Sequence, residues 1–251
     1  MTTVSEIALS LTRTCTTVPP EQYDVCRVCH GSPSPGFAVC YSCAQTMSQV
    51  SFPCDRVVPA SLYKTRSQLH YFLKYYKDDP RKDFAVKIVA LLSYFLARHS
   101  GCIASTAGGR WDIITTVPST KDRAGEHPLA TAIGWVTGLR DQHEMLLRRA
   151  SAAIGHNAAN DLAFEPLRTL DGERVLVVDD TFTSGARAQS AASALARGGA
   201  QVVAVVPIGR VINPEYNDST REYWDRQSRI PFDFETCCLE PDTSEEEYDM
   251  W

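Results

Sequence analysis

The sequence predicts an α/β fold built on a parallel sheet and preceded by a small cysteine-rich module. Three apolar segments are predicted to be buried strands: DIITTV at 112–117, RVLVVDD at 174–180 and QVVAVVPI at 201–208. Their β-branched residues favour strands. A helix of small residues at 185–197, ended by Gly198-Gly199, separates the last two. This strand-helix-strand order implies parallel strands joined by a right-handed crossover.

Two helices are expected before the first strand. In residues 62–77, apolar side chains recur near helical spacing, and Asp78-Asp79-Pro80 breaks the pattern. Residues 83–99 form a second, more apolar helix. The longest apolar run, Ile88–Ala97, is about ten residues, too short for a bilayer that needs roughly 20. We therefore expect no membrane span.

The remaining segments give weaker signals. Residues 128–154 are expected to be helical with a break near Gly138, and residues 155–172 to be a loop. Residues 1–20 carry little structural signal, and the periodicity fades past Arg210 towards an acidic tail.

Charge and the N-terminus exclude some classes of protein. The chain has 251 residues, a net charge of −5 and a pI near 5.7, which does not indicate a nucleic-acid surface. A local basic patch at Arg140, Arg148 and Arg149 stays open. The N-terminus lacks a basic start followed by a long apolar block, so no signal peptide is expected and the predicted location is cytoplasmic.

The cysteines predict a metal site. Cys26-x2-Cys29 and Cys40-x2-Cys43 are separated by ten residues rich in glycine and proline. Two such pairs fit tetrahedral zinc, which can fold a segment with almost no core. Four thiolates leave no open position, so the zinc would be structural; His30 could substitute but is expected to be a bystander. Cys15, Cys54 and Cys102 are expected to be unligated, and Cys237-Cys238 is unassigned.

The turn after the second predicted strand suggests a phosphorylated sugar. Asp179 and Asp180 end that strand and can accept hydrogen bonds from a cis-diol such as ribose hydroxyls. The small, hydroxyl-rich turn Thr181–Gly185 leaves N–H groups free at a helix N-terminus, which attracts anions. Carboxylates that can bind sugar hydroxyls, next to backbone N–H groups that can bind a phosphate, suit a ribose 5-phosphate. The plain alternative is a capped strand-helix connection with Ser184 as N-cap.

VLVVDDTFTSGA at 175–186 resembles the phosphoribosyl-pyrophosphate (PRPP) motif of type I phosphoribosyltransferases. The resemblance implies a Rossmann-like domain with a helical hood, and Mg²⁺ bound with PRPP. Asp179 and Asp180 would hold the ribose hydroxyls. Relatives often carry Thr where this chain has Arg187, which could bind the phosphate, fold away or accept another anion. The residues implied around the 5-phosphate are Thr181, Phe182, Thr183, Ser184, Gly185, Ala186 and Arg187.

Across most of residues 23–210 the chain is similar to the branch named for the competence protein ComF. The matching features are the four-cysteine ribbon, Lys74-Tyr75, Val117-Pro118, Asn157, Ala163-Phe164 and Arg210. The implied domains are an extension at 1–20, a zinc ribbon at 21–55, a phosphoribosyltransferase-like domain at 56–210 with its helical segment at 62–99, and a C-terminal extension at 211–251.

The same branch implies two further loops. The segment after Val117 would bind pyrophosphate, through Pro118, Ser119, Thr120, Lys121 and Arg123, whose side chains suit that anion. Relatives continue with Arg-Gly-Phe-Asn-Gln, whereas this chain has RAGEHP at 123–128. The stretch 147–160 would be a flexible loop closing over substrate, with Arg148, Arg149 and Asn157 as candidates.

Two functions stay open. The first is an enzyme that binds Mg-PRPP and transfers the phosphoribosyl group to an unidentified nucleophile, releasing pyrophosphate. The alternative is a non-catalytic module of competence type that binds PRPP or a nucleotide, with the ribbon contacting a protein partner or single-stranded DNA. The ribbon itself is not basic, with only Arg27 between its first two cysteines, so direct DNA binding is weakly supported. A homodimer is a further expectation.

Overall fold

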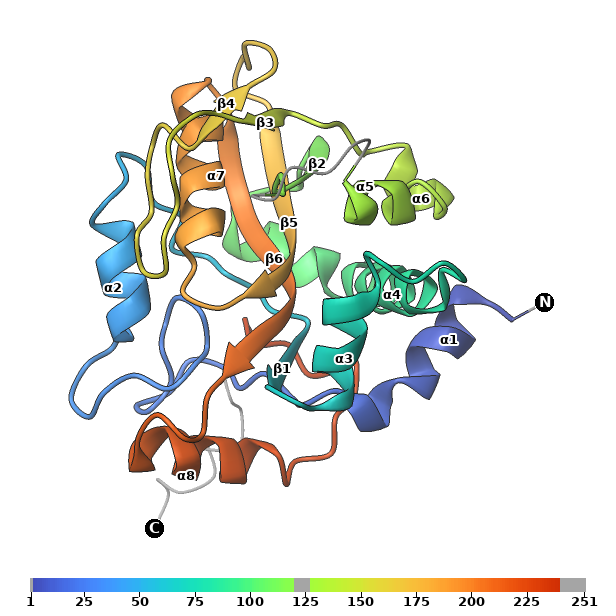
Figure 1. Ribbon diagram of the computed structural model, residues 1–251, viewed down its shortest axis with the longest axis vertical. Coiled ribbons are helices and arrows are strands. Elements are labelled where there is room, and N and C mark those ends of the chain that lie inside the picture. The colour runs from blue at the N-terminus through green and yellow to red at the C-terminus, as the bar shows by residue number, and fades with distance from the viewer. Residues whose placement is uncertain (1, 120–126, 240–251) are drawn as a thin grey trace.

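A parallel sheet forms the centre of the computed structural model, which describes residues 2–119 and 127–239 (Figure 1). Its four strands are ordered β1-β6-β5-β2, and every neighbouring pair is parallel. The predicted α/β fold is confirmed at this level, with all three expected strands present and β1 added at the edge. The strands are β1 (Ser61–Lys64), β2 (Ile113–Thr116), β5 (Arg174–Phe182) and β6 (Gln201–Ile212).

Both faces of the sheet are covered, and β5 shows why its sequence is a continuous apolar run. Val175 and Val177 pack with the alanines of α7 (Ala186–Arg197), whereas Leu176 and Val178 join the core around α4 (Asp83–Thr106). Successive strand residues point to opposite faces, so burial on both faces requires apolar residues throughout.

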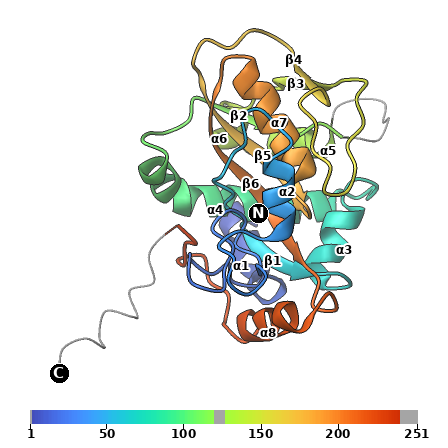
Figure 2. The ribbon, with the colours of Figure 1, turned by 90° about the vertical axis from the view of Figure 1, so that its left-hand side faces the viewer.

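Helices divide between the two faces (Figure 1). The α7 face also carries α2 (Tyr41–Met47) of the cysteine module, and Figure 2 shows α2 beside α7. The cysteines share a core with Val175 and Val177, so the module is packed onto the sheet domain. The remaining helices are α1 (Val4–Ser10), the 3-10 turn η1 (Thr12–Thr14), α3 (Gln68–Tyr75), α5 (Pro128–Ile133), α6 (Thr137–Arg140) and α8 (Asp218–Gln227).

The helix α4 is the one described helix that is long and apolar enough to cross a membrane by length and composition. Half of its 18-residue apolar stretch is buried inside the protein. Its apolar side chains are used in the contact with β6 and α5.

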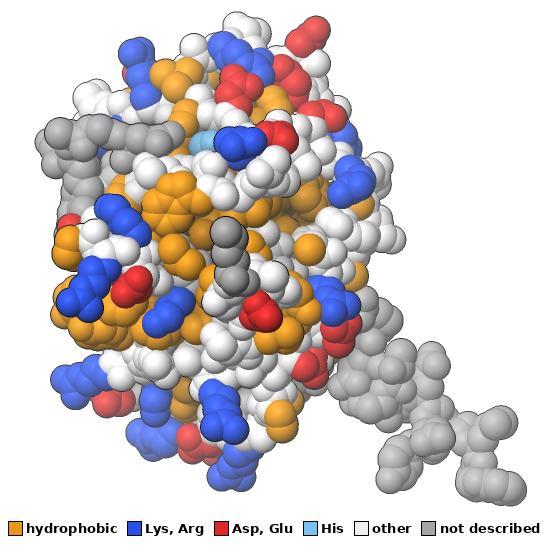
Figure 3. Space-filling view, turned by 90° about the vertical axis from the view of Figure 1, so that its right-hand side faces the viewer, with side chains coloured by type: hydrophobic (Ala, Val, Ile, Leu, Met, Phe, Trp, Pro, Cys, Tyr) orange, Lys and Arg blue, Asp and Glu red, His pale blue; other side chains and the backbone are white. Residues whose placement is uncertain are grey.

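Figure 3 shows hydrophobic side chains in a band across the face that carries α1 and the helices α3–α6. Exposed apolar side chains in this part of the chain include Leu9, Tyr71, Tyr75 and Trp135.

The expected helix at 62–77 was wrong in its first part. Residues 61–64 form the edge strand β1, which pairs with Gly209–Ile212 of β6, and Leu62 is fully buried there. The helix α3 begins only after Ser67, whose hydroxyl accepts a hydrogen bond from the His70 N–H. Tertiary pairing therefore overrides the helical spacing that Leu62 shares with later residues.

The expected helix at 128–154 and loop at 155–172 were also wrong in part. Two short helices, α5 and α6, end at Arg140, and β3 (Leu147–Arg149) then pairs antiparallel with β4 (Phe164–Pro166). Strands of three residues offer too few positions for an alternating pattern to stand out.

Helices occur near both ends of the described chain, where the apolar pattern is weak. The helix α1 begins at a capping box in which the Thr3 hydroxyl accepts from the Glu6 N–H and the Glu6 carboxylate accepts from the Thr3 N–H. The helix α8 follows Asn217, whose side chain caps Thr220 N. Buried Tyr223 and Trp224 attach α8 to the core.

The turn after α7 generates a stability prediction. Gly199 has φ 100°, and a Cβ there would lie 2.0 Å from the Leu170 carbonyl oxygen. Gly199→Ala should lower the unfolding free energy by at least about 2 kcal/mol, since both backbone strain and a backbone clash oppose it.

Gly101→Ala is the matched control for that measurement by denaturant unfolding. Gly101 lies within α4, and nothing lies within 4 Å of the added Cβ. This substitution should stabilise the protein by about 0.5–1 kcal/mol. Equal stabilities for the two variants would contradict the turn geometry.

Candidate functional site

The turn between β5 and α7 is built around one glycine. Strand β5 continues to Phe182, two residues beyond its predicted end, because Thr181 and Phe182 pair with Gly209 and Arg210 of β6. Gly185 then has φ 85° at the N-cap of α7, and a Cβ there would lie 2.5 Å from the Phe182 ring. Only glycine fits this position. Because Gly185 has no side chain, the N-terminus of α7 can lie directly against the Phe182 ring at the end of β5.

A cavity of about 280 Å³ lies at this turn. It is lined by Asp179, by 181–188 and by 154–156, which belong to the stretch expected to form a flexible loop. Asn157 N–H donates to Ser184 Oγ at 3.2 Å, so the two segments are in contact. The alternative interpretation was a simple strand-helix connection with Ser184 as N-cap. In the structure the N-cap of α7 is Gly185, and this position has no side-chain hydrogen bond.

Two polar atoms near the cavity are buried without a hydrogen-bond partner among the described residues. They are Arg187 Nε and Asn157 Oδ1. Asn157 also has φ 54°, a left-handed backbone conformation that Asn tolerates better than most residues. Buried polar atoms are normally satisfied, so both positions are candidates for contact with a bound molecule.

The acidic pair is buried and already paired with cations. Asp179 and Asp180 are each 2% exposed. Arg187 Nη2 lies 2.8 Å from Asp179 Oδ1, and Lys77 Nζ lies 2.5 Å from Asp180 Oδ2. The Tyr76 hydroxyl donates to the same Asp180 oxygen at 2.9 Å. Of the alternatives open for Arg187, the structure shows the side chain folded onto the acids.

The two carboxyls have opposite pKa shifts. Burial raises the pKa of Asp179 to about 7, against the opposing effect of Arg187 and with a contribution from the Asp180 charge. Burial would also raise the pKa of Asp180, but Lys77, Arg187 and the Tyr76 hydroxyl together lower it. Near neutral pH Asp179 is therefore protonated in part of the molecules, whereas Asp180 stays ionised.

Tyr76 and Lys77 were missed as site residues. They follow directly on α3, and the sequence KYYK at 74–77 shows cations and aromatic rings at a helix end without showing which of them face the sheet. Tyr63 was also missed; its hydroxyl lies 3.4 Å from Thr181 Oγ1. All three belong to the segment that was expected to be one helix.

The predicted pyrophosphate segment begins beside the acidic pair. Val117 N–H donates to Val178 O at 3.0 Å, so Pro118 and Ser119 follow β2 at the same end of the sheet as Asp179. Thr120, Lys121 and Arg123 lie outside the described residues.

The two arginines predicted for a flexible loop lie elsewhere. Arg148 and Arg149 belong to β3, and neither lines the cavity. The Arg148 guanidinium donates to Glu165 across the hairpin at 2.7 Å, in an exposed pair. Of the residues predicted in this stretch, only Asn157 is brought to the turn at 181–187.

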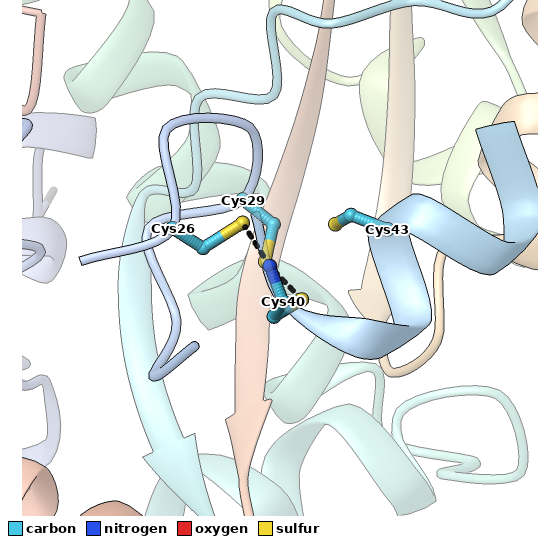
Figure 4. A group of neighbouring side chains, drawn as sticks. All are labelled: Cys26, Cys29, Cys40 and Cys43. Atoms are coloured by element: carbon cyan, nitrogen blue, oxygen red, sulfur yellow. Dashed lines mark hydrogen bonds between the residues drawn. The ribbon is translucent and has the colours of Figure 1, made fainter. Parts of the chain in front are cut away.

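The four predicted cysteine ligands are gathered at one point (Figure 4). Their sulfur atoms lie within 4.8 Å of one another, and Cys26, Cys29 and Cys43 are fully buried. Hydrogen bonds from Cys26, then from Cys40 and Cys43, hold the pKa of the Cys29 thiol well below its usual range, whereas hydrogen bonds with the other cysteines raise the pKa of Cys43 well above it. The spacing of the four sulfur atoms, rather than these opposite shifts, is what indicates that the group could hold an ion such as zinc. His30 is outside the group, with Nδ1 at 3.0 Å from Pro19 O.

Arg210 connects the cysteine group to the turn. Its Nε donates to Cys29 Sγ at 3.3 Å, and its Nη1 donates to the carbonyl oxygens of Thr183 at 2.8 Å and Phe182 at 3.3 Å. Its guanidinium carbon also lies 5.3 Å from the centre of the Phe182 ring. A second contact is the Thr46 hydroxyl, 3.4 Å from Ser184 O. The candidate metal centre and the turn are therefore adjacent.

Neither the comparison with protein-family models nor that with curated proteins finds a match for this chain. The geometry of the site therefore carries the functional argument.

The raised pKa of Asp179 predicts a pH dependence of stability. Its folded pKa of about 7 lies above the ordinary value of 3.8, so the protonated acid favours folding. That contribution is complete below about pH 4 and is lost as the pH rises to about 7, with a slope of at most about 1.4 kcal/mol per pH unit. Denaturant unfolding of wild type and Asp179→Asn at pH 4.5–8 measures it.

The difference in unfolding free energy, wild type minus Asp179→Asn, should fall across that pH range and level off above it. Asp180→Asn is the comparison, since the lowered pKa of Asp180 stabilises the folded state above about pH 4 and not below it. A wild-type-minus-Asp179→Asn difference that stays constant with pH would contradict the raised pKa.

The Arg210 bridge predicts that the cysteine group and the turn are coupled. Arg210→Gln should expose amides of 181–187 to hydrogen exchange at least about tenfold faster, because the carbonyls lose their donor and a buried thiolate loses its cation. Arg174→Gln is the control: Arg174 also donates to backbone carbonyls, those of Ala107, Gly109 and Arg110, but at the other end of β5. Unchanged exchange in Arg210→Gln would refute the coupling.

Proposed function

We propose that the chain binds Mg-PRPP at the turn 175–187 and transfers its phosphoribosyl group to a nucleophile, releasing pyrophosphate. The observation that carries the proposal is the cavity in which buried Asp179 lies beside the glycine-capped N-terminus of α7. Acceptors for hydroxyl groups and donors for a phosphate are thereby brought within one small volume.

Each part of the ligand has suitable groups. Asp179 and Asp180 are suited to accept from the ribose hydroxyls. The 5-phosphate is suited to the first N–H groups of α7, which lack partners within the helix, and to the hydroxyls of Thr183 and Ser184. Phe182 and Ala186 are buried, so they would contribute backbone groups and shape rather than side-chain contacts.

The cations on the acidic pair serve the same proposal. Two bare carboxylates would repel a ligand with several phosphate charges, and Lys77 and Arg187 neutralise them. For a ribose hydroxyl to donate to Asp179, Arg187 must give up part of its contact with that acid. Its partner-free Nε is then available to a phosphate oxygen.

The reaction would break the bond between ribose C1 and the pyrophosphate oxygen and form a bond from C1 to the nucleophile, which loses a proton. Magnesium bound with PRPP would supply charge stabilisation for the leaving group. Pro118 and Ser119 begin the segment proposed to hold pyrophosphate. None of the described cavity residues is assigned as the base that takes the proton from the nucleophile.

We infer a type I phosphoribosyltransferase-like domain of the ComF branch, with structural zinc in its ribbon. Four sulfur ligands favour zinc and a closed tetrahedral site. Zinc would fix the loops 26–31 and 38–43, and Arg210 would transmit that order to the turn.

The second candidate is a PRPP- or nucleotide-binding module without turnover. The observation that favours it is the contact between ribbon and turn through Thr46 and Arg210, by which an occupied site could alter a surface offered to a protein partner or to single-stranded DNA.

Ligand binding is tested by calorimetric titration of the full chain with PRPP and Mg²⁺. Asp179→Asn and Asp180→Asn should each lower the affinity about 100-fold or more, since a charged hydrogen-bond acceptor is lost in a buried site. Asp112→Asn is the matched control, because Asp112 accepts from Arg174 N–H at the opposite end of β5. Wild-type affinity in all three variants would refute the assignment.

Turnover is tested separately by pyrophosphate release from PRPP with a panel of bases and amines. Release that depends on one acceptor supports the transferase. Tight binding with no release across the panel would favour the binding module instead.

A further inference from the structure

A second group of metal-binding side chains lies on the opposite face of the sheet from the ribbon. It consists of His99 and Cys102 of α4 and Cys237 of the C-terminal segment, whose ligand atoms all lie within 4.8 Å of one another. His99 and Cys237 are buried, and Cys102 is half-buried. None of the three takes part in the proposed PRPP site.

The spacing is close to that of a zinc site. With Zn–S near 2.3 Å and Zn–N near 2.0 Å, tetrahedral sulfur and nitrogen ligands lie about 3.5 Å apart. His99 Nδ1 lies 3.9 Å from Cys102 Sγ. In the ribbon, Cys29 and Cys40 have sulfur atoms 3.7 Å apart, against about 3.8 Å for two tetrahedral sulfurs. A shift of a few tenths of an ångström would bring His99 and Cys102 to zinc spacing, and Cys237 lies within 4.8 Å of both.

The surrounding structure gives such an ion a role. Residues 229–239 form neither helix nor strand, yet they bury Phe234, Cys237 and Cys238. His99 and Cys102 are three apart on α4 and so share one helix face. An extended segment of this kind has few backbone hydrogen bonds of its own, and a metal bridge to a rigid helix would fix its position.

We propose that His99, Cys102 and Cys237 bind a second zinc ion, which attaches the C-terminal segment to α4. Two thiolates and an imidazole are ligands that zinc prefers over magnesium or calcium. Three protein ligands leave one position for water or a further donor. Half-buried Cys102 provides the side from which the ion enters. This inference does not depend on PRPP binding.

A disulfide between Cys102 and Cys237 is the competing chemistry for two sulfurs this close. It would consume both thiols with loss of two electrons and two protons to an oxidant, and it would leave His99 without a role in the cluster. Metal content and thiol state distinguish the two.

The test is zinc per chain, measured by elemental mass spectrometry on the full-length protein purified without chelator. Wild type should contain two zinc ions, and Cys102→Ser/Cys237→Ser one. Cys26→Ser/Cys40→Ser should lose the other ion. The matched control is Cys15→Ser, which removes a partly buried cysteine outside both groups and should retain two.

Cys102→Ser alone covers the case in which the double variant does not fold, since its position is half-exposed. One zinc equivalent should then pass to a chelator at least about tenfold faster than in wild type, with the other unchanged. A zinc content that the Cys102 and Cys237 substitutions leave unchanged, whether one ion or two, or a peptide map with Cys102 linked to Cys237 would each overturn the proposal.

Discussion

The buried guanidinium of Arg210 determines how the cysteine module and the turn between β5 and α7 are arranged. A cation in this position requires acceptors on every side, and it finds them in Cys29 Sγ and in the carbonyl oxygens of Phe182 and Thr183. The same guanidinium covers the Phe182 ring, which in turn leaves no room for a Cβ at Gly185. The start of α7 is therefore fixed by a chain of contacts that begins at the sulfur cluster.

Much of the sheet could be predicted from sequence because burial on both faces leaves a continuous apolar run. Val175–Val178 is such a run, and its neighbours at 201–208 are similar. The edge strand β1 could not be predicted, because its four residues directly precede a helix and Leu62 fits that helix's apolar spacing. Its partner Gly209–Ile212 also lies far along the chain. The pairing of β3 with β4 could not be predicted for the same reason, because the two strands are defined by their partners rather than by a local sequence pattern.

The candidate site likewise has a part that the sequence predicts and a part that only the packing reveals. Asp179 and Asp180 stand together at a strand end, and two pairs of cysteines three residues apart show their ligand spacing directly. The contact of Lys77 with Asp180 was hidden, because Lys77 reaches the strand end from the turn after α3 and its position depends on how α3 packs. His99 and Cys237 are likewise joined only by the packing of the C-terminal segment on α4.

The position of β6 between β1 and β5 has a consequence for synthesis on the ribosome. The cysteine module and β1 leave the ribosome early, but β1 has no strand to pair with until residues 209–212 have emerged. Arg210 emerges at the same stage, so all four cysteines leave the ribosome well before the guanidinium that contacts Cys29. Pairings of such high sequence separation form slowly, which leaves the edge of β1 open during translation. A chain truncated before Arg210 would thus expose both a sheet edge and an unneutralised sulfur cluster.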